Sequence, residues 1–263
     1  MQQEILKRYD RDGVSTLTLN SPTNLNALSE AMIDALASTL SEIAEDKSVR
    51  VLVLQGAGKA FCAGHDLKEM TQGRQAPDGG KAYFKMIFDK CAAMMTAIAR
   101  LPQPVIAKVH GVAVAAGCQL VATCDMAISS EDARFGVNGV NIGLFCSTPM
   151  VALSRNIPRK VAFELLTTGD LIPADRAHEL GLVNRVVASS ELDRATGEIA
   201  RKVAGKLGAA VKIGKLAFYE QAQMTVDRAY EYAGSVMVEN MLYRDTEEGI
   251  SAFLEKRPPS WSQ

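Results

Sequence analysis

The sequence predicts an α/β fold, and three observations carry that prediction. Short segments rich in Val, Ile and Leu alternate with segments of helical periodicity, which is typical of βαβ units. The chain has 263 residues, 48% of them hydrophobic, enough for a core that needs neither disulfides nor metal. Near residue 190 the strand pattern stops, and helical segments follow one another to residue 255.

The chain is expected to begin with two strands joined by a tight turn. Residues 3–9 and 14–19 have strand character, and Asp12-Gly13 between them is a turn signal. Residues 20–27 are expected to form a loop.

A helix and a buried strand follow this hairpin. Ser29 is a good N-cap for a helix over residues 30–46, whose apolar positions repeat at helical spacing: Met32, Ile33, Leu36, Leu40 and Ile43. Residues 50–55 are expected to form a short buried strand that ends at Gly56.

The middle of the chain continues the alternation. Residues 81–100 are expected to form a helix, and residues 104–109 and 125–129 two more buried strands. Stretches rich in Gly and Ala, residues 56–66 and 111–117, follow two of the strands. Such stretches let another backbone or a ligand approach closely.

The change of pattern divides the chain into two regions. Residues 1–190 are expected to form the α/β core, which holds the binding pocket. Residues 191–263 hold many charges and few strand formers, so we expect a helical region that packs on a neighbour or partner.

Composition argues against several classes of function. Lys and Arg total 29 against 30 Asp and Glu, and this balance argues against nucleic-acid or membrane-surface partners. Five Cys without a CxxC pair and three His without HxxxH argue against a disulfide framework or a metal site. The polar N-terminus MQQEILKRYD shows no leader pattern, so the predicted location is the cytoplasm.

Two segments share one local design that suggests chemistry. In Ala57 to Leu67 and in His110 to Leu120, a buried strand delivers the chain into small residues that open a helix. Free N–H groups at helix starts favour negative charge, so two such ends facing one point would form an oxyanion hole. A plain packing role for both turns stays open. Neither segment matches a P-loop or a dinucleotide fingerprint.

Several motifs in order along nearly the whole chain resemble the crotonase (enoyl-CoA hydratase/isomerase) superfamily. They are Asn26-Ala27-Leu28, Lys59 to Met70, Pro104 to Ala107, Gly117 to Leu120, Cys124-Asp125, Phe135-Gly136, Leu166 to Asp170, Gly181 to Val183 and Glu248 to Arg257.

The resemblance implies a ClpP/crotonase-like spiral of ββα units with a C-terminal helical trimerisation region, in homotrimers or dimers of trimers. It implies an acyl-CoA substrate that brings coenzyme A with it, and no tightly bound cofactor. The implied oxyanion donors are the N–H groups of His65 and Ala116. The implied coenzyme contacts are Ala63, Gly64, His65, Asp66 and Leu67, together with Phe253 and Lys256, which match positions that reach a neighbouring subunit's coenzyme A.

The sequence departs from the family at both acid–base positions of the hydratases. Gln119 and Gly139 stand where the resemblance places two glutamates. An amide does not take up a proton at neutral pH and glycine has no side chain; such groups contribute roughly 10²–10⁴ in rate each. One subgroup of the family, which this chain resembles around residues 117–119 and 143–149, lacks the same glutamates.

For other side chains near the same loop, more than one interpretation remains open. Cys146 or Ser147 is a candidate nucleophile, or the segment simply turns into a helix with Pro149 at its first position. The His65 imidazole either acts as an acid or base or lines the coenzyme channel, and Asp66 is expected to order its own turn.

We therefore expect an acyl-CoA-binding protein of this family with an intact oxyanion hole and poor hydration activity. The alternatives are a non-catalytic acyl-CoA-binding or regulatory protein, or another lyase, isomerase or thioesterase reaction.

Overall fold

The computed structural model describes residues 4–262 and confirms the predicted α/β class. One sheet has the strand order β1-β2-β3-β4-β6-β9, and a smaller one has the order β5-β7-β8. In the larger sheet β1 is antiparallel to β2 and the other neighbours are parallel. The strands are β1 Leu6–Arg11, β2 Val14–Leu19, β3 Val51–Gly56, β4 Val105–Val109, β5 Val112–Val114, β6 Met126–Ser130, β7 Arg134–Gly136, β8 Leu171–Pro173 and β9 Arg185–Val187.

Helices connect these strands and form the C-terminal end of the chain. They are α1 Glu30–Glu45, α2 Leu67–Gly73, α3 Lys81–Arg100, α4 Ala116–Thr123, α5 Pro149–Asn156, α6 Arg159–Thr168, α7 Ala174–Glu179, α8 Leu192–Ala204, α9 Gly208–Gln221, α10 Val226–Met241 and α11 Arg244–Leu254. Short 3₁₀ helices occur at Pro22–Asn24, Asn138–Ile142 and Ser189–Glu191.

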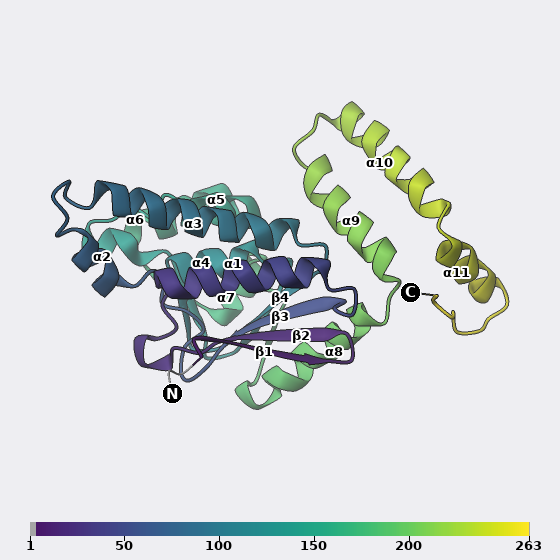
Figure 1. Cartoon of the computed structure of the whole chain (residues 1–263), viewed down its shortest axis with the longest axis horizontal. Coiled ribbons are helices and arrows are strands. Elements are labelled where there is room, and N and C mark those ends of the chain that lie inside the picture. Colours follow the sequence, from purple (N-terminus) through teal and green to yellow (C-terminus); the bar gives the residue numbers. More distant parts are fainter. Residues whose placement is uncertain (1–3, 263) are drawn as a thin grey trace.

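Helices cover both faces of the larger sheet (Figure 1). The main core lies between the larger sheet and helices α1 and α3, where Leu52 and Leu54 of β3 are buried. The alternate residues Val51 and Val53 pack on the other face against α8. This alternation follows from the two-residue period of a strand.

Along the chain, a strand of the larger sheet is twice followed by a strand of the smaller sheet and then by a helix. Strand β4 lies in the larger sheet, β5 lies in the smaller one, and α4 follows; β6, β7 and α5 repeat this order. These repeats are the ββα units that the resemblance implied. They place the loop after β3 beside β5, as the isolated bridge between Cys62 and Ala113 shows.

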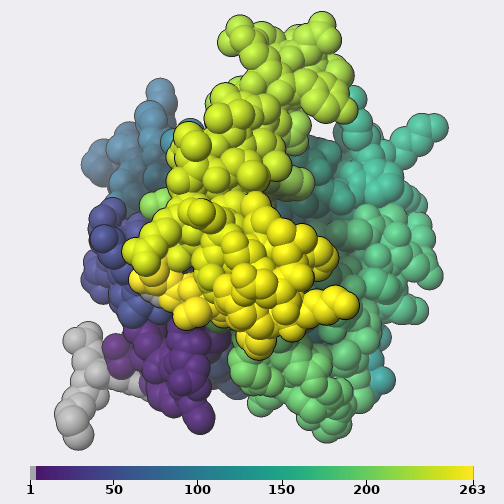
Figure 2. Space-filling model, turned by 90° about the vertical axis from the view of Figure 1, so that its right-hand side faces the viewer, coloured from purple at the N-terminus to yellow at the C-terminus, as the bar shows by residue number. Residues whose placement is uncertain are grey.

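The last three helices form an arm that leaves the body of the molecule (Figures 1 and 2). Helix α8 lies beyond the predicted boundary at residue 190, yet Leu192, Ala195 and Ala200 pack on the sheet. The arm therefore begins at α9. Within it, α10 buries none of its residues against this chain. Among residues 4–262, the helices are all too short or too polar to cross a bilayer.

The elements that were predicted from clear periodicity agree closely with the structure. Ser29 caps α1 as predicted, since its hydroxyl accepts from the Met32 N–H at 3.2 Å. Helix α3 has the predicted bounds, 81–100. The first predicted strand extends further, to Arg11, and residue 3 lies outside the described residues.

Candidate functional site

The first predicted oxyanion segment holds His65 in a short parallel pairing with Leu28. The Leu28 N–H donates to the Gly64 carbonyl at 2.7 Å, and the Asp66 N–H donates to the Leu28 carbonyl at 3.4 Å. Successive N–H groups of an extended segment point to opposite sides. The pairing therefore directs the His65 N–H away from Leu28.

The second predicted segment contains a strained residue, Ala115, between β5 and α4. Its φ of 49° and ψ of −119° are rare for a residue with a Cβ atom and cost of order 1–3 kcal/mol. The Ala115 N–H donates to the Gly136 carbonyl at 2.9 Å, and its carbonyl accepts from the Gln119 N–H at 3.0 Å. Ala116 is the first residue of α4, where an N–H has no acceptor within the helix. The backbone of Ala115 thus sets the direction of the Ala116 N–H.

Contact between the two loops brings the predicted donors close together. A Cβ atom added to Gly64 would lie 3.3 Å from the Ala116 nitrogen and 3.2 Å from the Val114 oxygen. A Cβ atom added to Gly117 would collide with the Cys62 carbonyl. The small residues of both motifs therefore serve close packing, and this packing places His65 next to the start of α4.

Two buried polar side chains near these donors lack partners. Both ring nitrogens of His65 and the Oε1 atom of Gln119 are buried without a hydrogen bond in the described structure. The His65 ring packs edge-on against Phe88, with ring centroids 5.4 Å apart. Burial lowers the pKa of His65, and the Leu28 backbone opposes part of this shift. The imidazole is therefore neutral at pH 7.

Asp66 orders its own turn, as predicted. Its carboxylate caps α2 by accepting from the N–H groups of Lys68 at 2.9 Å and Glu69 at 3.3 Å, and it also accepts from Asn24 at 3.1 Å. Next to it, the Leu67 side chain is half exposed, and the Ala63 N–H donates to the Leu25 carbonyl. Of the predicted coenzyme contacts in this loop, Leu67 is the one most open to a ligand.

The loop after β7 fills the space around Gly139, where the resemblance implies the second hydratase glutamate. A Cβ atom added to Gly139 would lie 2.7 Å from the Cys146 sulfur and would collide with the Leu144 carbonyl. Burial raises the pKa of the Cys146 thiol, although the Gly139 backbone opposes the shift. Ser147 is exposed and its hydroxyl donates to the Phe145 carbonyl at 3.4 Å. The thiol is therefore protonated at neutral pH, which disfavours the nucleophile reading of Cys146.

The structure does not bring the C-terminal pair of predicted coenzyme contacts to these loops within one chain. Phe253 is 82% exposed on α11, and Lys256 follows that helix with a φ of 54°. Helix α11 lies at the opposite side of the molecule from α2 (Figure 1). Their contact with the coenzyme of a neighbouring chain stays a prediction.

Sequence reasoning did not single out Ala115 or Phe88. The backbone of Ala115 depends on contacts with Gly64 and Gly136, which are distant in sequence, so no local pattern reveals it. Phe88 lies on the predicted helix 81–100, but periodicity does not tell which aromatic residue of that helix faces His65.

Comparisons with known proteins agree with the fold and the motifs. A family model described as enoyl-CoA hydratase/isomerase matches residues 10–263. Human enoyl-CoA hydratase domain-containing protein 3, mitochondrial, is 45% identical over 95% of this chain and 81% of its own length. A crystal structure of an enoyl-CoA hydratase from Mycobacterium smegmatis has 53% identity and a TM-score of 0.95, covering 99% of this chain and 100% of that one. The crystal structure of the human protein has 42% identity and a TM-score of 0.94, covering 98% of this chain and 100% of that one.

These comparisons confirm the crotonase fold and the predicted resemblance to the subgroup of enoyl-CoA hydratase domain-containing protein 3. They also correct the predicted location. The cytoplasmic prediction is wrong, because the relatives from human, rat and Xenopus are named as mitochondrial proteins. It rested on the N-terminal residues, whereas location depends on address signals that are separate from the residues that build a fold.

Proposed function

Because the chain belongs to the enoyl-CoA hydratase/isomerase family, we propose that it binds an acyl-CoA thioester and polarises the thioester carbonyl between two backbone N–H groups. These are the N–H groups of His65 and Ala116. The observation that carries the proposal is the contact of Gly64 with the start of α4, next to the strained Ala115. Coenzyme A enters as part of the substrate and lies along Ala63 to Leu67.

Hydration of an enoyl group is expected to be slow. Gln119 takes up no proton at neutral pH, and Gly139 offers no side chain. The space at Gly139 is also filled by Leu144 and Cys146. The family chemistry that relies on the two carboxylates therefore has no counterpart in these residues.

Two versions of the function differ in what happens after binding. The unpaired His65 nitrogens and Gln119 oxygen favour an acyl-CoA enzyme with unusual acid–base groups, of the lyase, isomerase or thioesterase type. The closed position at Gly139 and the protonated Cys146 favour a non-catalytic acyl-CoA-binding or regulatory protein. Turnover of any member of a panel of enoyl-, hydroxyacyl- and acyl-CoA thioesters would select the first version.

The arm is proposed to join copies of this chain into homotrimers or dimers of trimers. Its helices expose large apolar side chains: Phe218, Val226, Tyr230, Met237, Val238, Met241, Leu242, Phe253 and Leu254. No residue of α10 is fully buried in its own chain, so this helix would gain stability from packing on another copy. In such an assembly Phe253 and Lys256 would reach the coenzyme A of a neighbour.

Substitution of Gly64 tests the oxyanion hole directly. The variant Gly64→Ala forces a Cβ atom against Ala115 and Ala116, so the two donors separate. We expect acyl-CoA turnover, where present, to fall roughly 10²–10³-fold. We also expect the infrared carbonyl band of a bound ¹³C-labelled thioester to return toward its position in water.

Gly79→Ala is the matched control. Gly79 has a similarly positive φ of 68°, but a Cβ atom there meets nothing within 4 Å. The Gly79→Ala variant therefore introduces the same kind of backbone strain without a contact at the site. A carbonyl band that shifts equally in wild type and Gly64→Ala would rule out polarisation by this pair. Failure of the wild type to bind any acyl-CoA would rule out the proposed function altogether.

A further inference from the structure

The last residues that the structure describes fold back along α11. Residues 257–262 follow this helix, and we call them the tail. The Ser260 N–H donates to the Glu248 carboxylate at 2.8 Å. The N–H and the hydroxyl of Ser262 donate to Asp245 at 2.9 and 2.6 Å. The tail therefore runs back from the end of α11 to the side of its first turn.

The tryptophan of the tail connects α11 to the body of the molecule. The Trp261 ring packs on Gly249 of α11, because a Cβ atom added to that glycine would lie 3.1 Å from the ring. Its indole N–H donates to the Gly205 carbonyl, between α8 and α9, at 3.4 Å. Helix α11 is thus held by its own chain before any neighbour is present.

A bidentate ion pair fastens the start of the tail to α11. The Arg257 guanidinium donates to both oxygens of Glu248, at 2.6 and 2.9 Å, and its Nε atom donates to Glu255 at 2.6 Å. A single exposed ion pair contributes little, whereas a two-point pair within a network holds a defined geometry. Arg257 and the Ser260 N–H lower the pKa of Glu248 to about 2, so this carboxylate stays ionised at neutral pH.

The residue before Arg257 has a backbone that is unfavourable for a lysine. Lys256 has a φ of 54°. Its N–H donates to the Phe253 carbonyl at 3.2 Å, and the Arg257 N–H donates to the Ala252 carbonyl at 3.0 Å. Helices that end with these two hydrogen bonds usually have glycine at this position, because a Cβ atom disfavours the left-handed backbone. Strained residues of this kind cluster at functional sites, so we looked for a function of the lysine side chain.

Lys256 and Phe253 present a cation and an aromatic ring at the end of α11. Phe253 is 82% exposed. Lys256 is exposed too, and among residues 4–262 its ammonium group has no hydrogen-bond or ion-pair partner. An aromatic ring stacks on a nucleobase, and an ammonium group binds a phosphate. The pair therefore fits the adenosine phosphate end of coenzyme A.

We propose that the tail positions Lys256 and Phe253 for the adenosine phosphate end of a coenzyme A that is bound to a neighbouring chain. This inference rests on the proposed acyl-CoA function. The pair of Glu248 and Arg257 holds Lys256 in its left-handed backbone, and Trp261 holds the helix that carries Phe253. Glu248 and Arg257 are positioning residues, because their charges pair with each other and act on the coenzyme through Lys256.

Titration calorimetry with coenzyme A measures the contribution of Lys256. Lys256→Gln should weaken binding about tenfold or more, because a charged hydrogen bond is lost, and Lys256→Arg should restore most of the affinity. Lys256→Gly relieves the backbone strain, so it should raise the melting temperature and still weaken binding as much as Lys256→Gln. A role of Lys256 in folding alone predicts no loss of affinity in the glycine variant.

Glu248→Gln distinguishes positioning from direct contact by Arg257. If the ion pair positions Lys256, this variant should weaken coenzyme A binding about two- to fivefold. If Arg257 bound the coenzyme itself, loss of its carboxylate partner would leave a free cation and strengthen binding. Arg257→Met should also weaken binding, and it should add little in the Lys256→Gln background, because residues that act through one another are not additive.

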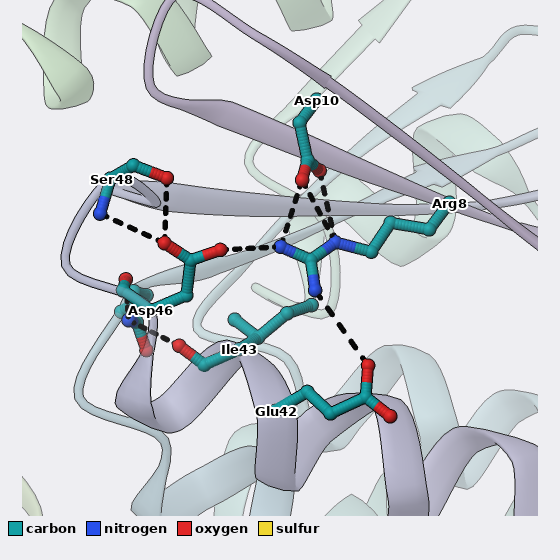
Figure 3. Close-up of polar contacts among 7 residues, drawn as sticks. Arg8, Asp10, Glu42, Ile43, Asp46 and Ser48 are labelled. Atoms are coloured by element: carbon teal, nitrogen blue, oxygen red, sulfur yellow. Dashed lines mark hydrogen bonds and ion pairs between the residues drawn. The ribbon is translucent and has the colours of Figure 1, made fainter.

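Arg8 in the body provides the matched control (Figure 3). Its guanidinium donates to Asp10 at 2.9 Å and to Asp46 at 2.7 Å, so it too joins two carboxylates. Arg8→Met should lower the melting temperature and leave the affinity for coenzyme A unchanged. Sedimentation checks whether Arg257→Met keeps the assembly of the wild type. The Lys256 variants leave the side-chain contacts of the tail in place, so they test the proposal even where Arg257→Met dissociates.

Three results would overturn this inference alone. They are wild-type affinity for coenzyme A in Lys256→Gln, equal or tighter binding by Glu248→Gln, and fully additive losses when Arg257→Met is combined with Lys256→Gln. Each of them leaves the proposed function in place, because the wild type still binds coenzyme A. A wild type that does not bind coenzyme A would overturn the proposed function and this inference together.

Discussion

At the scale of single residues, we expect that adding a glutamate at position 139 does not restore hydration activity. Gly139→Glu places a carboxylate where the resemblance to the hydratases implies one, but the Leu144 carbonyl and the Cys146 sulfur occupy that space. We expect no hydration of crotonyl-CoA above background and a loss of stability of about 1–3 kcal/mol from overpacking.

The companion substitution Gln119→Glu introduces the other carboxylate without such a collision, because Gln119 and Glu have nearly the same shape. It serves as the control for Gly139→Glu. Spectrophotometric hydration assays on both single variants and on the double variant check the prediction. Hydration by Gly139→Glu at the rate of a two-glutamate enzyme would contradict it.

The reactivity of Cys146 follows from its environment. Burial raises the pKa of its thiol, and the thiolate is the nucleophilic form. We therefore expect iodoacetamide to modify Cys146 more slowly than free cysteine between pH 7 and 9. The rate should rise with pH only above the ordinary range of a free thiol. Mass spectrometry of the peptide that carries Cys146 measures this alkylation rate. Rapid alkylation at pH 7 would contradict the prediction and support Cys146 as a nucleophile.

At the scale of elements, a buried lysine ties the arm to the body. Lys215 of α9 donates to Asp125 at 2.7 Å and to the carbonyls of Ile98 and Gln103. Tyr219, one turn further, donates to the same carboxylate at 2.7 Å. Burial lowers the pKa of Lys215, and the nearby Asp125 opposes that shift. These contacts make α9 the anchored part of the arm.

Removal of the Lys215 cation should lower the free energy of unfolding. Lys215→Met leaves the Asp125 carboxylate without its ion pair, and breaking a buried pair costs about 3–5 kcal/mol. We expect a loss near the lower end, because Tyr219 and the Val105 N–H still donate to Asp125. Urea unfolding measures the change, with Lys202→Met on the exposed side of α8 as the control. A loss below 1 kcal/mol would show that the anchor contributes little.

At the scale of the whole molecule, the arm predicts self-association. A monomer of 28.3 kDa would expose the apolar side chains of α10, so we expect sedimentation at a multiple of this mass. Met237→Glu with Met241→Glu should shift the protein toward the monomer, because charges do not pack in an apolar interface. Lys160→Glu, on the exposed side of α6, changes the net charge by the same two units and is the control. A wild-type monomer at micromolar concentration would contradict this prediction.

Much of this architecture follows from the sequence where one residue pattern determines one element. Ser29 and the apolar spacing of residues 30–46 gave α1, and the same periodicity gave the bounds of α3. Strands β5, β7 and β8 are three residues long, too short for a period-two pattern to be visible. Helix α8 belongs to the body because its apolar side packs on Val51 and Val53. That contact depends on the tertiary structure.

The candidate site, too, could be predicted only in part from the sequence. The two small-residue segments were visible as motifs, and the structure shows why they are small: Gly64 and Gly117 pack against the opposite loop. The strain at Ala115 and the crowding at Gly139 were not visible, because both arise from residues far apart in sequence. Sequence motifs identified which atoms matter, and tertiary contacts determine whether a substitution fits.

The crowding around Gly139 also bears on how this chain could be redesigned. Because the segment from Leu144 to Cys146 packs against a glycine, a larger residue at position 139 meets a collision. A variant with a carboxylate there first needs a different path for this loop, and moving the loop alone adds no catalytic group. Stepwise single substitutions therefore face a barrier that exchange of the whole loop would avoid.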